Sequence, residues 1–303
     1  MKLFSLGKEA AYRRLRGDVP FTFTEACIIS EELGLSLDVI VNMQIKGHKV
    51  LYELTTPPEK MNTIKEYKEF YYNTLYNEHH SLFEKYKDKT SLNIISACNI
   101  IPQSLLLPYI YLLHFRAFKW IYQLYTGPFP YTCSDIKINE EMIHKLKEIS
   151  SKISDISNMT FILGRNIITT FIKQILHFRR LRMIPDEYFV KIKDDLLSFV
   201  SDLEQTALLG KNRARRQVWI FLSNIDFESN YTHISHEGGE HSFMQVYQIH
   251  SLSSLDPSAN KITKEWVESL RKYATLISLS GEMERIAFFE EQKRNINNLL
   301  KIE

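Results

Sequence analysis

Apolar side chains return every three or four residues through most of the chain after residue 60, and this spacing constrains the fold more than any other feature. Within Lys60–Lys87 it is carried by Ile64, Tyr67, Tyr71 and Leu75. Such intervals place one apolar stripe along an α-helix. The same pattern recurs in the ranges Gln103–Tyr125, Asn139–Ser154, Thr160–Met183 and Asp186–Leu209.

A different pattern follows residue 217. Val218–Leu222 is a short run of β-type residues, and Asn230–Ser235 and Phe243–Ile249 follow it, with Gly238 and Gly239 between the last two. Adjacent glycines between two short runs of this kind indicate a hairpin turn. The sequence therefore predicts a mainly α protein: an N-terminal helix-turn-helix-like module plus a large helical domain with a small antiparallel β-sheet near residues 217–250.

The end of the chain is predicted to form two more amphipathic helices, interrupted at Ser280–Gly281. We expect one stripe to serve the core of the domain and the other to be free for a second copy of the chain, because a twofold contact reuses one patch on both subunits. The two stripes consist of Trp266, Leu270, Tyr273 and Ile277, and of Ile286, Phe289, Ile296 and Leu300.

Composition excludes two classes of protein. Of the 303 residues 44% are hydrophobic, and only ten are glycine and nine proline, which is typical of a folded, helix-rich chain and not of a disordered one. The net charge of +2 is too small for the whole molecule to bind polyanions. Any nucleic-acid role must therefore come from a local cluster of cations.

The cysteines and the longest apolar run bear on the compartment. Cys27, Cys98 and Cys133 are odd in number and form no Cys-x-x-Cys pair, which favours a reducing compartment over a disulfide or zinc framework. The run Ile100–Tyr125 contains ionisable residues that are costly within a membrane, and charged residues soon follow Met1 in place of an apolar signal sequence. We expect a cytoplasmic protein that does not cross a membrane.

The first forty residues concentrate positive charge on a short helix. Lys8, Arg13, Arg14 and Arg16 lie close together, and Gly17 follows them as a residue that can end a helix. The next helix opens with the Thr-x-x-Glu pattern of a capping box at Thr22 and Glu25. This segment is predicted to be a compact helical unit that presents cations.

The spacing within this segment resembles the second half of a Cro/repressor-type (XRE family) helix-turn-helix. In that family the recognition helix ends in Arg-x-Gly, the next helix ends in Leu-Gly, and a Ser-Leu-Asp cap follows; Arg16-Gly17, Leu33-Gly34 and Ser36–Asp38 stand at those places. Only Met1–Ser5 stand in front of the matched part, whereas the family has two further helices there. Either those helices are encoded upstream of Met1 or this chain has lost them.

The resemblance implies a DNA-binding role for the helix Leu6–Arg16, which would enter the major groove. Four of its residues are implied at base edges, and Arg14 or Arg16 at phosphates. Because one short helix reads too few base pairs for specificity, a homodimer is implied as well. The implied DNA-binding residues are Lys8, Glu9, Tyr12, Arg13, Arg14 and Arg16.

Three parts are predicted along the chain: a partial helix-turn-helix module over residues 1–42, a linker over 43–58 that contains Pro57-Pro58, and a helical regulatory or dimerisation domain with a small sheet over 59–303. This organisation is typical of a bacterial transcriptional regulator, which is not an enzyme and needs neither cofactor nor metal. Its expected partners are double-stranded DNA, a second copy of the chain, and an effector, small molecule or peptide, that the sequence does not identify.

Two other classes of protein stay open. In one, the N-terminal segment is a vestigial helix-turn-helix that binds a protein partner. In the other, His233–His241 holds a catalytic metal. A zinc-binding His-Glu-x-x-His motif needs a helix and a second histidine, but position 240 is Glu and Gly238-Gly239 would break the helix. The segment is therefore interpreted as a hairpin turn.

Overall fold

The computed structural model describes residues 8–33, 37, 50, 52–54, 61–89, 91–156 and 158–298. The chain divides into two compact units, Met1–Leu51 and Tyr52–Glu303. None of the described helices combines the length and apolar character needed to span a bilayer.

The first unit contains two described helices, α1 (Lys8–Leu15) and α2 (Phe23–Leu33). Gly17 follows α1 with a φ of +81°, a backbone conformation in which glycine has no Cβ to strain. The predicted capping box is confirmed, because the Thr22 amide donates to Glu25 Oε2 at 2.8 Å and the Glu25 amide donates to Thr22 Oγ1 at 3.3 Å. Local sequence chemistry therefore fixes where these helices end and begin.

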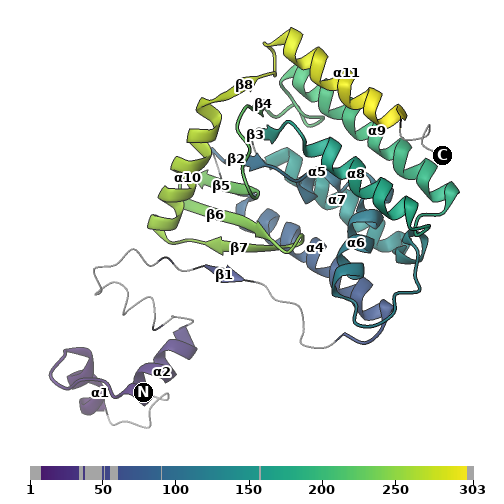
Figure 1. Cartoon of the computed structure of the whole chain (residues 1–303). Helices are drawn as coiled ribbons and strands as arrows, with labels where there is room; N and C mark the ends of the chain where they lie inside the picture. Colours follow the sequence, from purple (N-terminus) through teal and green to yellow (C-terminus); the bar gives the residue numbers. More distant parts are fainter. Residues whose placement is uncertain are drawn as a thin grey trace. The chain divides into compact units, whose positions relative to one another are not determined.

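The second unit is built on one eight-stranded mixed sheet with the order β1-β7-β6-β5-β2-β3-β4-β8 (Figure 1). Strands β2, β3 and β4 are parallel at its centre, and every other pairing is antiparallel. The strands are β1 (Glu53–Leu54), β2 (Asn93–Cys98), β3 (Asn158–Gly164), β4 (Val218–Ser223), β5 (Tyr231–His236), β6 (Gly239–Val246), β7 (His250–Ser254) and β8 (Ala274–Leu276).

One face of the sheet carries most of the helices. The connections from β2 to β3 and from β3 to β4 both join parallel neighbours in the same direction, and right-handed crossovers then place their helices on the same face. These helices, with α4 before them, are α4 (Ile64–Tyr86), α5 (Gln103–Leu106), α6 (Ile110–Leu124), the 3-10 helix η1 (Cys133–Ile136), α7 (Glu140–Ile156), α8 (Ile167–Arg180) and α9 (Asp186–Leu209).

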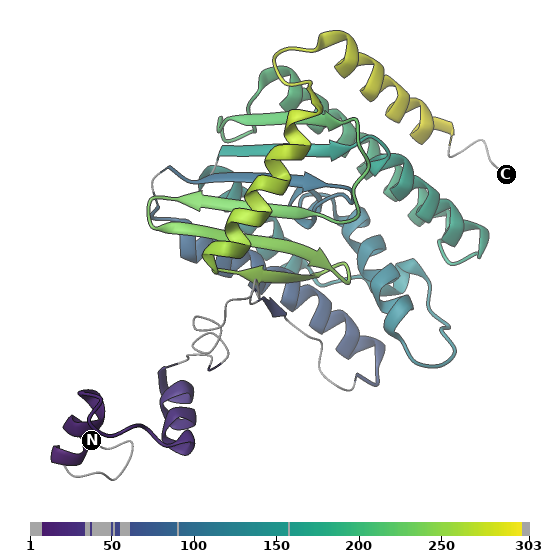
Figure 2. The same cartoon turned by 60° about the vertical axis from the view of Figure 1, so that its left-hand side comes forward.

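The opposite face is crossed by α10 (Pro257–Lys272), as Figure 2 shows. This helix leads from β7 to β8, which lie near opposite edges of the sheet, so its chain must run across the strands between them. Val267 and Leu270 of α10 pack there against Ala97 of β2 and Ile162 of β3. The last helix, α11 (Glu282–Asn298), packs along α9 and α8 on the other face.

The predicted fold class, mainly α with a small antiparallel sheet near residues 217–250, is wrong. The protein is mixed α/β, and its eight-stranded sheet extends far beyond that range. The three predicted strands exist as β4, β5 and β6, but β4 pairs in parallel with β3 and belongs to the centre of the sheet. The range Thr160–Met183, predicted as one helix, begins within β3, and the observed helix α8 starts only at Ile167.

The end of the chain also differs from the expectation. The helix predicted through Tyr273 and Ile277 ends at Lys272, and β8 occupies Ala274–Leu276. Phe289 and Ile296 of the second stripe are fully buried in the unit's own core, so they are not free for a second copy of the chain. Leu300 lies outside the described residues.

Candidate nucleic-acid helix and ligand cleft

Helix α1 presents most of its predicted DNA-binding residues to solvent. None of its side chains is buried within the structure, and five of the six predicted residues are exposed. Glu9, Arg13 and Arg16 follow the spacing i, i+4, i+7 and lie along one stripe of the helix, continued past its last turn. The exposed residues are Lys8, Glu9, Tyr12, Arg13 and Arg16.

Arg14 differs from the other cations of α1. Its Nε lies 3.0 Å from Glu25 Oε1 on α2, and the two side chains are only 17% and 13% exposed. This hydrogen-bonded pair, together with the Thr22 amide, keeps the pKa of Glu25 below its ordinary value; the amide contributes most. Arg14 therefore ties α1 to α2, and Arg16 is the more accessible of the two arginines predicted to reach phosphates.

Other parts of the N-terminal prediction fall where the structure gives no description. Gly34, Ser36 and Asp38 of the family pattern, and most of the linker over 43–58, lie outside the described residues. Within that linker range, Glu53 and Leu54 form β1 and pair with β7.

The histidine-rich segment is a hairpin, as predicted. Strands β5 and β6 pair from Tyr231 to Met244, with Gly238 in the turn and Gly239 opening β6. His233 Nε2 lies 3.5 Å from Glu240 Oε1, and the Glu240 carboxylate also pairs with Lys264 of α10. On the other side, His241 Nδ1 shares a hydrogen bond of 2.9 Å with the Tyr86 hydroxyl of α4. Since α10 and α4 cover opposite faces, these two histidines do not converge on one ion. Within the described part of the chain no group of three metal-ligating side chains occurs.

A cleft of about 690 Å³ opens between α7 and α9 and reaches the sheet at the first halves of β3 and β4. We call it the α7/α9 cleft. Its volume lies in the range of small-molecule sites in proteins. The apolar part of its lining includes Leu105, Met159, Phe161, Phe199, Leu203 and Val218.

A hydrogen-bonded chain of three side chains stands in this cleft. The Tyr109 hydroxyl donates to Asp202 Oδ2 at 2.5 Å, and Arg213 Nη2 donates to the same oxygen at 2.7 Å. Burial, and then the hydrogen bond to Asp202, raise the pKa of Tyr109, so the phenol stays protonated. The Tyr109 ring packs edge-on against Phe199, with 5.5 Å between ring centroids. Asp202 is thus held in one orientation between the aromatic wall and the opening.

The rest of the polar lining is rich in hydroxyl groups. Ser154 donates to the Ser150 carbonyl and Thr206 donates to the Asp202 carbonyl, which leaves their oxygen lone pairs as acceptors. The charged residues of the lining are Lys147, Asp155, Asp202 and Arg213, so positive and negative charges are equal in number. The cleft therefore suits a compact ligand with an apolar body and several hydrogen-bonding groups, carrying no net charge.

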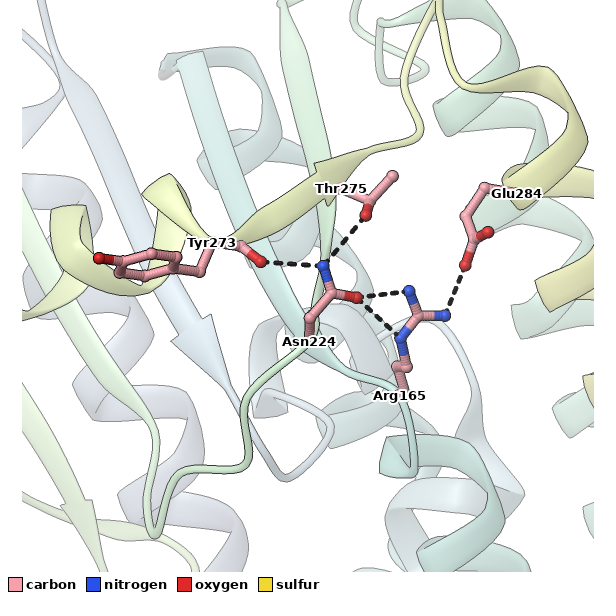
Figure 3. Close-up of polar contacts among 5 residues, drawn as sticks. All are labelled: Arg165, Asn224, Tyr273, Thr275 and Glu284. Carbon is pink, nitrogen blue, oxygen red and sulfur yellow. Dashed lines mark hydrogen bonds and ion pairs between the residues drawn. The ribbon is translucent and has the colours of Figure 1, made fainter.

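A second polar cluster lies where β3 and β4 end, the edge at which parallel α/β sheets commonly bind ligands. Arg165 Nε and Nη2 donate to Asn224 Oδ1, and Arg165 Nη1 donates to Glu284 of α11 (Figure 3). Asn224 Nδ2 donates to the Tyr273 carbonyl at 2.9 Å and to Thr275 Oγ1 at 3.3 Å. The members of this cluster satisfy one another, so we interpret it as a tie that fastens β8 and α11 to the sheet.

Sequence reasoning missed the cleft entirely. Arg213 lies outside the ranges predicted as helices or strands, and Tyr109 and Asp202 lie within ranges predicted as helices. No local motif links these two, because 93 positions separate them along the chain. Only the packing of α6 beside α9 brings them together.

Comparisons with known proteins add no further identification. No family model matches the chain, and no curated protein or solved structure shows significant similarity to it.

Proposed function

We propose that this protein is a bacterial transcriptional regulator that binds double-stranded DNA through α1 and binds an effector through its larger unit. The observation that carries the proposal is the exposure of Lys8 and Arg13 on α1, a helix that buries none of its side chains, and of Arg16 directly after it. Arginine and lysine exposed along one helix are the groups that contact base edges and phosphates in the major groove.

Roles for the individual residues follow from their accessibility. Lys8, Glu9, Tyr12 and Arg13 are the proposed base-facing residues, and Arg16 the proposed phosphate contact. Its exposed ion pair with Asp18, at 3.5 Å, is weak enough to exchange for phosphate. Two protomers on one operator are part of the proposal, since a single short helix reads too few base pairs.

The α7/α9 cleft is the proposed effector site, because it combines an apolar lining with the oriented Tyr109–Asp202–Arg213 chain. The cytoplasm is the proposed compartment. Cys27, Cys98 and Cys133 are all free thiols, which a reducing compartment preserves.

The test is DNA binding measured by fluorescence anisotropy, with duplexes selected from a pool of randomised sequence. Arg13→Ala should weaken binding to the selected duplex by about 1 to 3 kcal/mol if it contacts a guanine edge. Arg16→Ala should lower affinity for all duplexes and reduce the slope of log affinity against log salt by about 1. Light scattering on the same samples should report dimers.

The matched control is Arg294→Ala, which removes an exposed arginine of α11 in the other unit and should leave DNA binding unchanged. Equal affinity of the wild type and the Arg13 and Arg16 variants would remove α1 from the DNA interface.

One observation favours an alternative, a protein-interaction role for the same unit. Leu15 and Phe23 are 75% and 79% exposed, although large apolar side chains are usually covered. A protein partner docked on this surface should be released by Leu15→Ser and Phe23→Ser, whereas DNA should be released by the loss of Arg13 and Arg16. The two sets of variants therefore distinguish the two functions.

A further inference from the structure

A second hollow, of about 350 Å³, lies between α6 and α8, and we call it the α6/α8 groove. Three nitrogen bases line it: Lys119 from α6, and Lys173 and His177 from α8. Lys173 and His177 are four residues apart and so share one face of their helix. No aspartate or glutamate is among the described residues that line this groove.

The composition of the chain does not explain this excess of positive charge. The protein has nearly as many acidic as basic residues, 36 against 38. On other helices several lysines stand one turn from a glutamate and pair with it, as Lys65, Lys145, Lys152 and Lys261 do. In the part of the chain that the structure describes, Lys119 and Lys173 form no such pair.

The Lys119 amine is held by a neutral group. Its Nζ donates to Gln174 Oε1 of α8 at 2.8 Å, which uses one of its three N–H donors. Burial of the amine, and then the charge of Arg116, lower the pKa of Lys119 to about 8. The amine therefore retains donors for a further acceptor, and a negative charge there would favour its protonated form.

Arg116, one turn earlier on α6, adds a fixed positive charge behind the groove. It is 1% exposed, and its Nη1 donates to the Ile101 carbonyl at 2.7 Å. Within the described residues no hydrogen bond of good geometry reaches its Nε or Nη2. The neighbouring Tyr71 hydroxyl favours its charged form, but no carboxylate pairs with it. A guanidinium buried without a counter-charge is costly, and a nearby anion lowers that cost.

Aromatic side chains form the apolar wall of the groove. The rings of Tyr122 and Phe178 lie edge to face, with 5.1 Å between centroids. Such a wall accepts the flat or apolar part of a ligand, and the amides of Gln123 and Gln174 stand beside it as hydrogen-bonding groups that can fix its orientation.

We propose that the α6/α8 groove binds a small organic anion, a phosphate monoester or a carboxylate whose oxygens face Lys119, Lys173 and His177 and whose apolar body packs on Tyr122 and Phe178. This site is separate from the α7/α9 cleft, whose lining carries balanced charge. It does not rest on the proposed DNA binding, so either idea can fail while the other stands.

The test is isothermal titration calorimetry of the full chain with phenyl phosphate, with benzoate, and with uncharged benzyl alcohol. We expect saturable 1:1 binding of at least one of the two anions and none of the alcohol. Lys119→Met and Lys173→Met should each weaken anion binding by about tenfold or more, since each removes a charge-assisted hydrogen bond. Stronger binding of phenyl phosphate than of benzoate would identify the phosphate monoester as the ligand class.

Two controls isolate the groove. Lys261→Met removes an exposed lysine of α10, and Arg13→Ala removes a cation of α1; both should leave anion binding unchanged. Lys173 is exposed, so its variant decides the matter even if Lys119→Met folds poorly. Binding should also weaken as the pH rises from 7 to 9, because the Lys119 amine, whose pKa is about 8, loses its proton in that range.

Absence of saturable binding of both anions would overturn the proposal. Anion binding that survives unchanged in Lys173→Met and in Lys119→Met would overturn it equally, because the anion would then bind elsewhere on the molecule.

Discussion

At the scale of single residues, contacts between close neighbours in the sequence set the ends of the N-terminal helices and one turn of the sheet. The Thr22–Glu25 capping box, the end of α1 before Gly17 and the turn at Gly238 all depend on contacts within a few positions. The Arg14–Glu25 pair could not be predicted, because it requires α1 and α2 to fold back on each other.

Gly281, between β8 and α11, lies where the neighbouring backbone leaves no room for a Cβ atom. Its φ is +64°, and an added Cβ would lie 2.2 Å from the carbonyl oxygen of Leu276. Gly127 also has a positive φ, +97°, but an added Cβ there would meet no atom within 4 Å. The two glycines therefore separate the cost of the backbone conformation from the cost of the clash.

We expect Gly127→Ala to cost about 1 kcal/mol of unfolding free energy, the usual penalty of a left-handed residue that carries a Cβ. Gly281→Ala should cost clearly more, since the backbone of Leu276 must also shift. Urea unfolding followed by circular dichroism measures both. Equal losses in the two variants would show that the loop before α11 adjusts freely.

At the scale of elements, the helices were predicted better than the parallel strands. The apolar stripe of α4 spans several turns, and its spacing of three and four residues is enough to predict a helix. Phe161, Ile162 and Leu163 of β3 form a continuous apolar run instead, because helices cover both faces of this part of the sheet. Such a run lacks the alternation of a half-exposed strand. The sequence pattern therefore predicts it as part of the helix that follows, α8.

The packing of helix α11 contradicts the prediction that Phe289 is free to contact a second copy of the chain, and it can be tested by substitution. Phe289 is fully buried, in ring contact with Phe288, whereas Ile286 on the same helix is 42% exposed. Phe289→Ala should therefore lower the free energy of unfolding by about 3 to 5 kcal/mol. Ile286→Ala, the matched control, should cost less than about 1 kcal/mol, because surface substitutions change stability little.

Urea unfolding and light scattering together measure these two variants. A Phe289→Ala protein as stable as the wild type but changed from dimer to monomer would restore the contact between copies that the sequence analysis predicted.

At the scale of the whole molecule, the topology and both hollows were beyond sequence reasoning. The order of the strands places β8 beside β4 although α10 and three other strands separate them along the chain. The α7/α9 cleft and the α6/α8 groove likewise lie between helices from different crossovers. Their lining residues acquire a shared environment only after the sheet has set the spacing of its helices.

The pH dependence of stability also belongs to the whole molecule, because buried groups from several elements contribute to it with opposite signs. Burial is the main cause that lowers the pKa of both His114 and His241 from 6.5 to about 4. Burial raises the pKa of Glu78 from 4.5 to about 7. Between pH 4.5 and 6.5 the unfolded chain therefore binds more protons at the two histidines, and the folded chain binds more at the glutamate.

Burial also lowers the pKa of His79 and His233 and raises that of Asp195, so four buried histidines oppose two buried carboxyl groups. Since stability rises with pH wherever the unfolded state binds more protons, the free energy of unfolding should fall on acidification from pH 6.5 to 4.5. His114→Gln should flatten this slope, and His144→Gln, at an exposed position of α7, should not. Urea unfolding at a series of pH values measures the slope. Stability that increases on acidification would mean that Glu78 and other carboxyl groups dominate, and that the two buried histidines are protonated in the folded protein.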